Sequence, residues 1–284
     1  MGVSADTVLR RGAVAWLHWR AEYMEVPDLS DADLSWLNLR GTDLHDVNLR
    51  RVNLSDAKLV AANLSGSNLS NSILDRADLV NADLRSIESI NCRAVGANFR
   101  DANLSDANLM ASNLAFTDLR GANLARVNAI SIDFTSANLR SADLDRMKLY
   151  RATLCYADLV EANLAQADLS QAILTETELG SAHLYRTNFA QALLNRSHLV
   201  NVYAAYANFE RANLTGADLA WANLTKTNFA GAILRGTNLR GANLTGADLS
   251  GADLTGANLR GANLSDAKLK RTIFTDPNLT DTVL

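Results

Sequence analysis

The chain has 284 residues, of which 48% are hydrophobic, 6% aromatic and 20% charged, and its 27 basic and 31 acidic side chains give a net charge of -4. This near balance argues against a polybasic protein that binds nucleic acid or membrane surfaces through its charge. Two cysteines are too few for a disulfide framework, and no apolar run reaches the roughly 18 residues of a membrane span. We therefore expect a cytoplasmic protein.

The first 26 residues differ from the rest of the chain and are predicted to form an N-terminal capping helix (residues 1–26). Asp6 is a suitable N-cap, and apolar residues recur at helical spacing over residues 6–24 before Pro27 ends the pattern. These apolar residues are Leu9, Ala13, Trp16, Leu17, Trp19 and Tyr23. We interpret the two tryptophans as packing residues of a lid over the segment that follows.

A repeat of five residues occupies residues 27–284. From Leu29 onward the frame contains 52 repeats, whose central residue is Leu in 42, Phe in 6 and smaller in four. Ala most often stands two residues before the centre, with Asn or Asp between them, as in Ala242-Asn243-Leu244. A period of five fits neither a helix nor a flat strand, and it favours a chain that turns a corner in every repeat. The centre and the residue two before it are then predicted to point inward.

The four small centres test this inside-outside assignment. Each is accompanied by a larger or similar residue two positions earlier, in the pairs Ile87 with Ser89, Cys92 with Ala94, Val127 with Ala129, and Val202 with Ala204. A close-packed interior requires such an exchange of volume. The exchange predicts that Cys92 is buried, whereas Cys155, which directly follows a centre, is exposed.

The A-(N/D)-L-x-x pattern resembles that of the pentapeptide repeat family over residues 27–284, and especially its cyanobacterial-type members rich in Ala-Asn/Asp-Leu. The resemblance implies an all-β fold, a right-handed quadrilateral parallel β-helix. With four repeats in each coil, the 52 repeats give about 13 coils. Glycines such as Gly216, Gly236 and Gly256 stand two residues after a centre, which indicates turns.

Chemistry-bearing motifs are absent from the sequence: there is no phosphate-binding glycine loop, no zinc-ligand spacing and no nucleophile elbow. Residues 20 positions apart are expected to stack in one column, which would align Asp158, Glu178, His198 and Asp218. One histidine among flexible carboxylates is a weak ligand set, so we interpret this column as solvent-facing pairing rather than a metal site. We expect no enzyme activity, no cofactor and no catalytic or metal-binding residue.

Two departures from the repeat pattern are candidate interaction surfaces. On one side of the coil apolar residues gather, at Ile73, Phe116, Tyr156, Ile173, Leu193, Ile233 and Ile273, together with Trp36. The second departure places Tyr185, Tyr203 and Tyr206 beside Arg186 in two adjacent coils, and Tyr and Arg favour binding hot spots. The alternative explanation for the apolar side is that β-branched residues prefer extended backbone. The alternative explanation for the tyrosines is that they fill the turns irregularly without binding a partner.

The C-terminal repeats continue to the last residue without a second helix, and their edge carries Phe274, Leu279 and Val283. Open edges of stacked strands pair readily with other chains. Because two-fold symmetry is the commonest arrangement of identical subunits, we expect a homodimer through the C-terminal coils.

These observations favour a non-enzymatic rigid rod that acts as a protein-interaction module with an unknown partner. The family resemblance implies an alternative, since some members resemble duplex DNA in size and charge, bind DNA gyrase and protect it from topoisomerase poisons. Sorted by side, however, the repeats carry net charges of -3, -1, -2 and +2, so no side is densely anionic. We expect no direct binding to nucleic acid or membranes.

Overall fold

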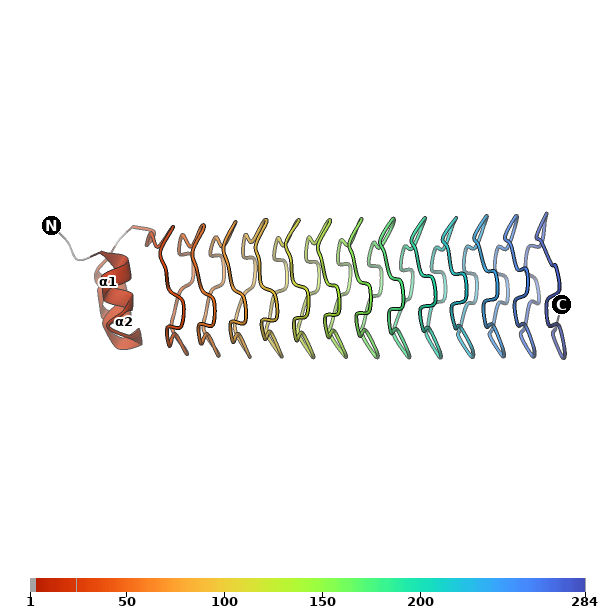
Figure 1. Ribbon diagram of the computed structural model, residues 1–284, viewed down its shortest axis with the longest axis horizontal. Coiled ribbons are helices and arrows are strands. Elements are labelled where there is room, and N and C mark those ends of the chain that lie inside the picture. The colour runs from red at the N-terminus through yellow and green to blue at the C-terminus, as the bar shows by residue number, and fades with distance from the viewer. Residues whose placement is uncertain (1–3, 24, 284) are drawn as a thin grey trace. The chain divides into compact units, whose positions relative to one another are not determined.

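The computed structural model describes residues 4–23 and 25–283. The chain forms two compact units, Met1–Asn138 and Leu139–Leu284, and each contains a stack of four-sided parallel turns (Figure 1). These turns confirm the right-handed quadrilateral β-helix. Met24, the end of the predicted helix, and Leu284, the last predicted repeat centre, lie outside the described residues.

Single parallel β-bridges, rather than extended strands, connect successive turns. The bridges run from Asp28–Asn48 to Asp118–Asn138 in the first unit and from Asp143–Asn163 to Asn263–Val283 in the second. Each bridge joins the residues before two centres that are 20 positions apart, as between Asn163 and His183. The amide of Leu164 donates to the carbonyl of His183 over 2.8 Å, and the same bond recurs throughout both units.

Every repeat ends in a tight corner. After the centre Leu164, the amide of Ala167 donates to the Leu164 carbonyl over 3.0 Å, and Gln166 has a φ of 59°. A bond between residues three apart, with a positive φ only at the third residue, defines a type II turn. The predicted glycine turns are confirmed, since Gly216 has a φ of 68°. Most corners nevertheless use other residues, which accept the left-handed conformation at some cost.

The Asn or Asp before each centre supports both the turn and the stack. The side-chain oxygen of Asn188 accepts a hydrogen bond from the amide two residues later, at 3.1 Å. The amide group of Asn188 donates to Asp168 at 2.8 Å, Asn208 donates to Asn188 at 3.0 Å, and Asn228 donates to Asn208 at 3.0 Å. Asn can extend such a ladder in both directions, whereas Asp only accepts and therefore begins it. The left-handed conformation belongs to the corner residue and not to the Asn/Asp position.

The interior of each turn is filled by the repeat centres and the small residues two positions before them. Leu164 and Ala162 are fully buried, as the repeat pattern predicts. In the second unit Phe189, Phe209 and Phe229 form a buried stack with ring centroids 4.9 Å apart and interplanar angles of 6° and 9°. The inward column thus combines hydrophobic burial with favourable ring contacts.

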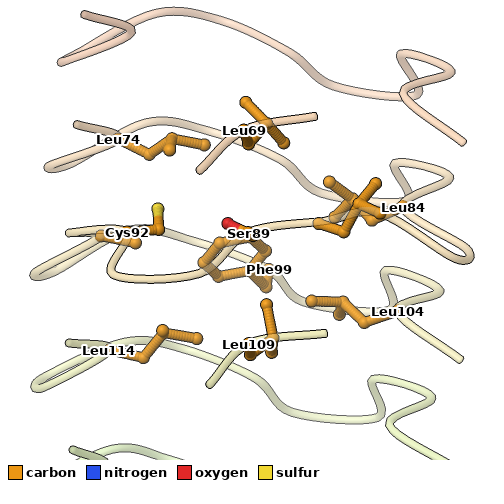
Figure 2. A pocket seen from close by; sticks show the side chains of 11 residues that line it. Leu69, Leu74, Leu84, Ser89, Cys92, Phe99, Leu104, Leu109 and Leu114 are labelled. Atoms are coloured by element: carbon orange, nitrogen blue, oxygen red, sulfur yellow. The ribbon is translucent and has the colours of Figure 1, made fainter. Parts of the chain in front are cut away.

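Where a repeat centre is small, the residue two positions earlier and its neighbours fill nearly all of the interior. Ser89, Cys92 and Ala94 are buried in the first unit beside a cavity of about 10 Å³, toward which leucines of neighbouring turns point (Figure 2). The Ser112 hydroxyl donates to the Ser89 carbonyl at 2.6 Å and accepts from the Cys92 amide at 2.9 Å. Burial raises the pKa of the Cys92 thiol, as expected for an unreactive core cysteine. Cys155 is partly exposed.

The N-terminal segment contains two helices, α1 (Ala5–Leu9) and α2 (Ala13–Glu22), so the prediction of one helix over residues 6–24 was wrong. Gly12 interrupts the segment with a φ of 101°, a conformation that a right-handed helix excludes. The predicted N-cap was also wrong, because Asp6 lies inside α1 and its carboxylate pairs with Arg10 at 3.0 Å. Neither described helix is long and apolar enough to cross a membrane.

The helices cap the first turn through side-chain hydrogen bonds. Trp16 is fully buried, and its indole Nε1 donates to the carbonyl of Asp43 at 2.6 Å. The guanidinium of Arg10 likewise donates to the carbonyl of Asp33. These carbonyls belong to the first turn and lack a preceding turn to bond them, so the helices satisfy an open edge. Only part of the predicted apolar face packs inward, since Leu17 is 56% exposed.

Candidate functional site

Four aromatic rings gather on one outward face of the second unit; we call His183, Tyr185, Tyr203 and Tyr206 the aromatic cluster. His183 and Tyr203 form a β-bridge, and their rings stack with centroids 5.1 Å apart and an interplanar angle of 5°. Tyr185 lies 6.1 Å from Tyr203 and meets Tyr206 edge-on at 5.9 Å. The structure thus brings together the three predicted tyrosines, and it adds His183, which sequence reasoning did not include.

Two cations cover rings of the cluster. The Arg186 guanidinium lies 5.2 Å from the centroid of Tyr185 and 5.9 Å from that of Tyr206, and the Lys226 ammonium lies 5.5 Å from Tyr206. Arg186, Tyr206 and Lys226 occupy successive corners, so the Tyr206 ring holds a position between the cations. Within the described part of the chain, neither cation pairs with a carboxylate and none of the three tyrosine hydroxyls makes a hydrogen bond.

Cations elsewhere on the repeats are commonly paired with carboxylates one turn away. Arg51 and Asp31 approach to 2.6 Å, and so do Arg76 and Asp56. Such pairs neutralise the surface and support the stack, although exposed ion pairs contribute little energy each. The cations of the aromatic cluster are different, because their partners within the chain are rings.

The predicted apolar side is less continuous than its sequence spacing suggests. In the second unit Ile173 and Leu193 are bridged neighbours, 37% and 42% exposed, and Thr153 precedes them. Asn213 separates this pair from Ile233 in the same column. The remaining members in this unit also expose their side chains, at Tyr156 and Ile273.

In the first unit the apolar residues are separate. Ile73 is 42% exposed and lies between Asn53 and Arg93 in its column. Phe116 occupies a corner and is 63% exposed, and Trp36 occupies another at 71%. Single exposed apolar side chains are ordinary features of protein surfaces.

The column of titratable residues does not converge on a common point. His198 Nδ1 lies 2.8 Å from the Glu178 carboxylate, whereas Asp218 accepts a hydrogen bond from Asn238 at 2.9 Å. Arg140 lies 3.1 Å from Asp158. Among residues 4–23 and 25–283, no three His, Cys, Asp or Glu side chains are arranged to hold a metal ion.

Trp221 is a prominent exposed residue that sequence reasoning missed. It is 57% exposed and lies against Gly241, where an added Cβ would come within 2.3 Å of the indole ring. The Arg240 guanidinium lies 5.7 Å from the ring centroid. The signal was present in the sequence, since a glycine follows the tryptophan by one full turn and leaves room for the ring.

The last described turn exposes apolar residues, two of them, Phe274 and Leu279, at centre positions that earlier turns bury. Phe274 is 36% exposed, Leu279 41% and Val283 52%. Within the described residues, the backbone amides of Phe274 and Leu279 donate to no carbonyl, although amides at this position in earlier turns do so. This edge therefore presents both apolar surface and unpaired donors.

Four-sided turns of five-residue repeats, with inward Leu and Ala and an Asn/Asp ladder, define a class of β-helical repeat protein. A family model described as "Pentapeptide repeats" matches this chain in overlapping copies that cover residues 28–86 and 90–276. The chain belongs to the pentapeptide repeat family. The short gap between the matched segments contains the small centre Ser89.

Several solved structures of pentapeptide repeat proteins are similar to this chain. HetL, involved in heterocyst differentiation regulation in Nostoc sp. strain PCC 7120, is 29% identical with a TM-score of 0.43, over 92% of this chain and 95% of HetL. A protein of the Arabidopsis thaliana thylakoid lumen is 32% identical with a TM-score of 0.32, over 33% of this chain and 65% of its own. QnrB1, a plasmid-mediated fluoroquinolone resistance protein, is 20% identical with a TM-score of 0.32, over 69% of this chain and 88% of its own. Curated proteins gave no match.

Proposed function

We propose that this protein is a rigid, non-enzymatic scaffold that binds another protein through an outward face of its repeats. The aromatic cluster carries the proposal, because Tyr203 and Tyr206 are 40% and 45% exposed and add nothing to the buried core. Tyr, Trp and Arg are enriched among the residues that dominate binding energy at protein interfaces. A stack of hydrogen-bonded turns holds such side chains in fixed positions, which lowers the entropy lost on binding.

The test compares capture of proteins from the source organism by immobilised wild-type chain and by the double variant Tyr203→Asn/Tyr206→Ser. These substitutions restore residue types that the repeat accepts at both positions, so the fold is expected to remain. Tyr156→Ser is the matched control, because Tyr156 is an exposed corner tyrosine outside the cluster. We expect one protein to be retained by wild type and control and lost with the double variant. If no protein is enriched by the wild-type chain, the scaffold proposal fails.

Binding to DNA gyrase or another topoisomerase is the competing proposal. Mimicry of duplex DNA requires closely spaced uncompensated negative charges, about one per 1.7 Å. Carboxylates on these repeats are often neutralised, as at Arg126–Asp106, 2.7 Å, and Arg120–Asp118, 2.6 Å. A gyrase supercoiling assay with and without a topoisomerase poison decides between them, and we expect no protection.

We also propose that the last turn mediates self-association of the chain. Two copies meeting about a two-fold axis would cover Phe274, Leu279 and Val283 and satisfy exposed backbone donors. Light scattering of the 284-residue chain is then expected to give twice the monomer mass at micromolar concentration. Leu279→Asp is expected to return the monomer without loss of circular dichroism. A wild-type monomer throughout the concentration range would rule out the dimer.

A further inference from the structure

We propose that the aromatic cluster, with Arg186 and Lys226, binds an acidic, extended peptide segment of the partner protein. This inference rests on the proposed scaffold function and assigns the chemistry of the segment that the scaffold recognises. The binding groups are the two cations and the hydroxyls of Tyr185, Tyr203 and Tyr206. Each of these groups is a donor that makes no hydrogen bond or ion pair within the described residues.

The charge on this face is one-sided. Four consecutive turns contribute repeats to it, and these repeats contain no Asp or Glu although the chain is acidic overall; they are residues 162–166, 182–186, 202–206 and 222–226. Arg186 and Lys226 are their only formal charges. Complementarity of charge therefore favours an anionic occupant.

The two cations also have a defined separation. Arg186 and Lys226 are two turns apart, and with about 4.8 Å between bridged turns their corners are about 10 Å apart. Three residues of extended chain, at about 3.1 to 3.3 Å each, cover the same distance. A segment that lies along the column and carries carboxylates three residues apart can therefore reach both cations.

The ring arrangement favours carboxylates over nucleic-acid bases. Binding of single-stranded nucleic acid relies on aromatic faces that are open for stacking. Here His183 and Tyr203 stack on each other, and Arg186 and Lys226 lie over Tyr206. The hydroxyls, in contrast, are free to donate to carboxylate oxygens.

The experiment measures binding of labelled peptides to the full chain by fluorescence anisotropy. The probe is Gly-Glu-Pro-Pro-Glu-Gly, in which the prolines keep two carboxylates in an extended segment three residues apart. We expect saturable binding that weakens with added salt and is lost when both glutamates of the probe are replaced by glutamine. Absence of binding by the probe, or equal binding of the glutamine peptide, would overturn the proposal.

Variants of the chain locate the binding site. Arg186→Gln/Lys226→Gln is expected to weaken binding of the probe by roughly fivefold or more, since exposed charge pairs are each worth up to about a fivefold change. Arg196→Gln/Lys268→Gln is the matched control, because it removes the same charge from the same unit at cations that already lie near Glu176 and Asp248. Equal weakening by both double variants would show general charge attraction and overturn the site.

Two further outcomes separate this inference from the function on which it rests. If Arg186→Gln/Lys226→Gln still captures the natural partner, the acidic-peptide site is wrong while the scaffold function stands. If an oligothymidine probe binds more tightly than the peptide and is lost in the same variant, the site binds single-stranded nucleic acid and the proposal is overturned. Loss of both the peptide and the natural partner in this variant supports it.

Discussion

The stack of three phenylalanines in the second unit allows the contribution of ring contacts to be measured. Phe209 has a ring neighbour on each side, with centroids 4.9 Å away, whereas Phe189 has one. In the same column Leu169 and Leu249 occupy the adjoining centres, so leucine is accepted at this position. Phe209→Leu removes two ring pairs, and Phe189→Leu removes one. At about 0.5–1.5 kcal/mol per pair, Phe209→Leu is expected to destabilise the unit by that amount more than Phe189→Leu.

The assay is native-state hydrogen exchange of backbone amides in the turns that contain these residues. Repeat proteins unfold in sections, and exchange reports the stability of each section where a single global midpoint does not. Combining both substitutions gives a double-mutant cycle whose coupling energy isolates the contact between Phe189 and Phe209. Equal losses in the two single variants, with no coupling, would refute the reasoning.

Other predictions test burial, reactivity and charge. Leu164→Asp places an unpaired carboxylate at a fully buried position and is expected to lower the free energy of unfolding by more than about 4 kcal/mol. The control Gln166→Asp changes an exposed corner residue and is expected to have almost no effect on stability. Equal melting temperatures of the two variants would contradict the inward assignment of Leu164. Cys92 is expected to react with a thiol reagent only as the chain unfolds, and rapid labelling of both cysteines in the native protein would contradict its burial. The hydrogen bond from the Arg120 side chain lowers the pKa of Asp118 in the folded chain. This contact therefore stabilises the fold at a pH above the pKa of an unfolded Asp, about 3.9, and the stabilisation is lost as the pH falls and Asp118 is protonated. The urea midpoint of Arg120→Gln is therefore expected to decline less than that of wild type between about pH 5 and pH 3.

The repeat architecture could be predicted from the sequence because its cause is local and repeated. A bulky residue at every fifth position, with a small one two residues earlier, leaves few ways to fill a narrow interior. Departures from the pattern follow the same volume rule, since the small centre Ala94 is accompanied by the larger Cys92 two positions earlier. The ladder of Asn and Asp side chains does not follow from the five-residue pattern alone, because it joins residues 20 positions apart and depends on the register between turns.

The two N-terminal helices and the aromatic cluster were harder to predict, for different reasons. Helical spacing suggested one helix, but Gly12 lies between α1 and α2 in a backbone conformation that periodicity does not reveal. His183 occupies an Asn/Asp position of the repeat, and its significance depends on Tyr203 occupying the same column one turn later. The contact between Trp221 and Gly241, in contrast, follows from their spacing of 20 residues once four repeats are assigned to each turn.

The fixed turn length has a consequence for how such a chain can change its length during evolution. Loss of one five-residue repeat between Arg186 and Tyr203 would preserve the backbone ladder, because the repeats in this part of the second unit bond to the neighbouring turns in the same way. It would nevertheless move Tyr203 by one quarter of the circumference away from His183, which lies one turn earlier in the present chain. Only insertions or deletions of 20 residues, or of a multiple of 20, return each side chain to its original face. A recognition surface made from stacked side chains therefore constrains length changes within it to whole turns, even where the fold itself would accept a single repeat.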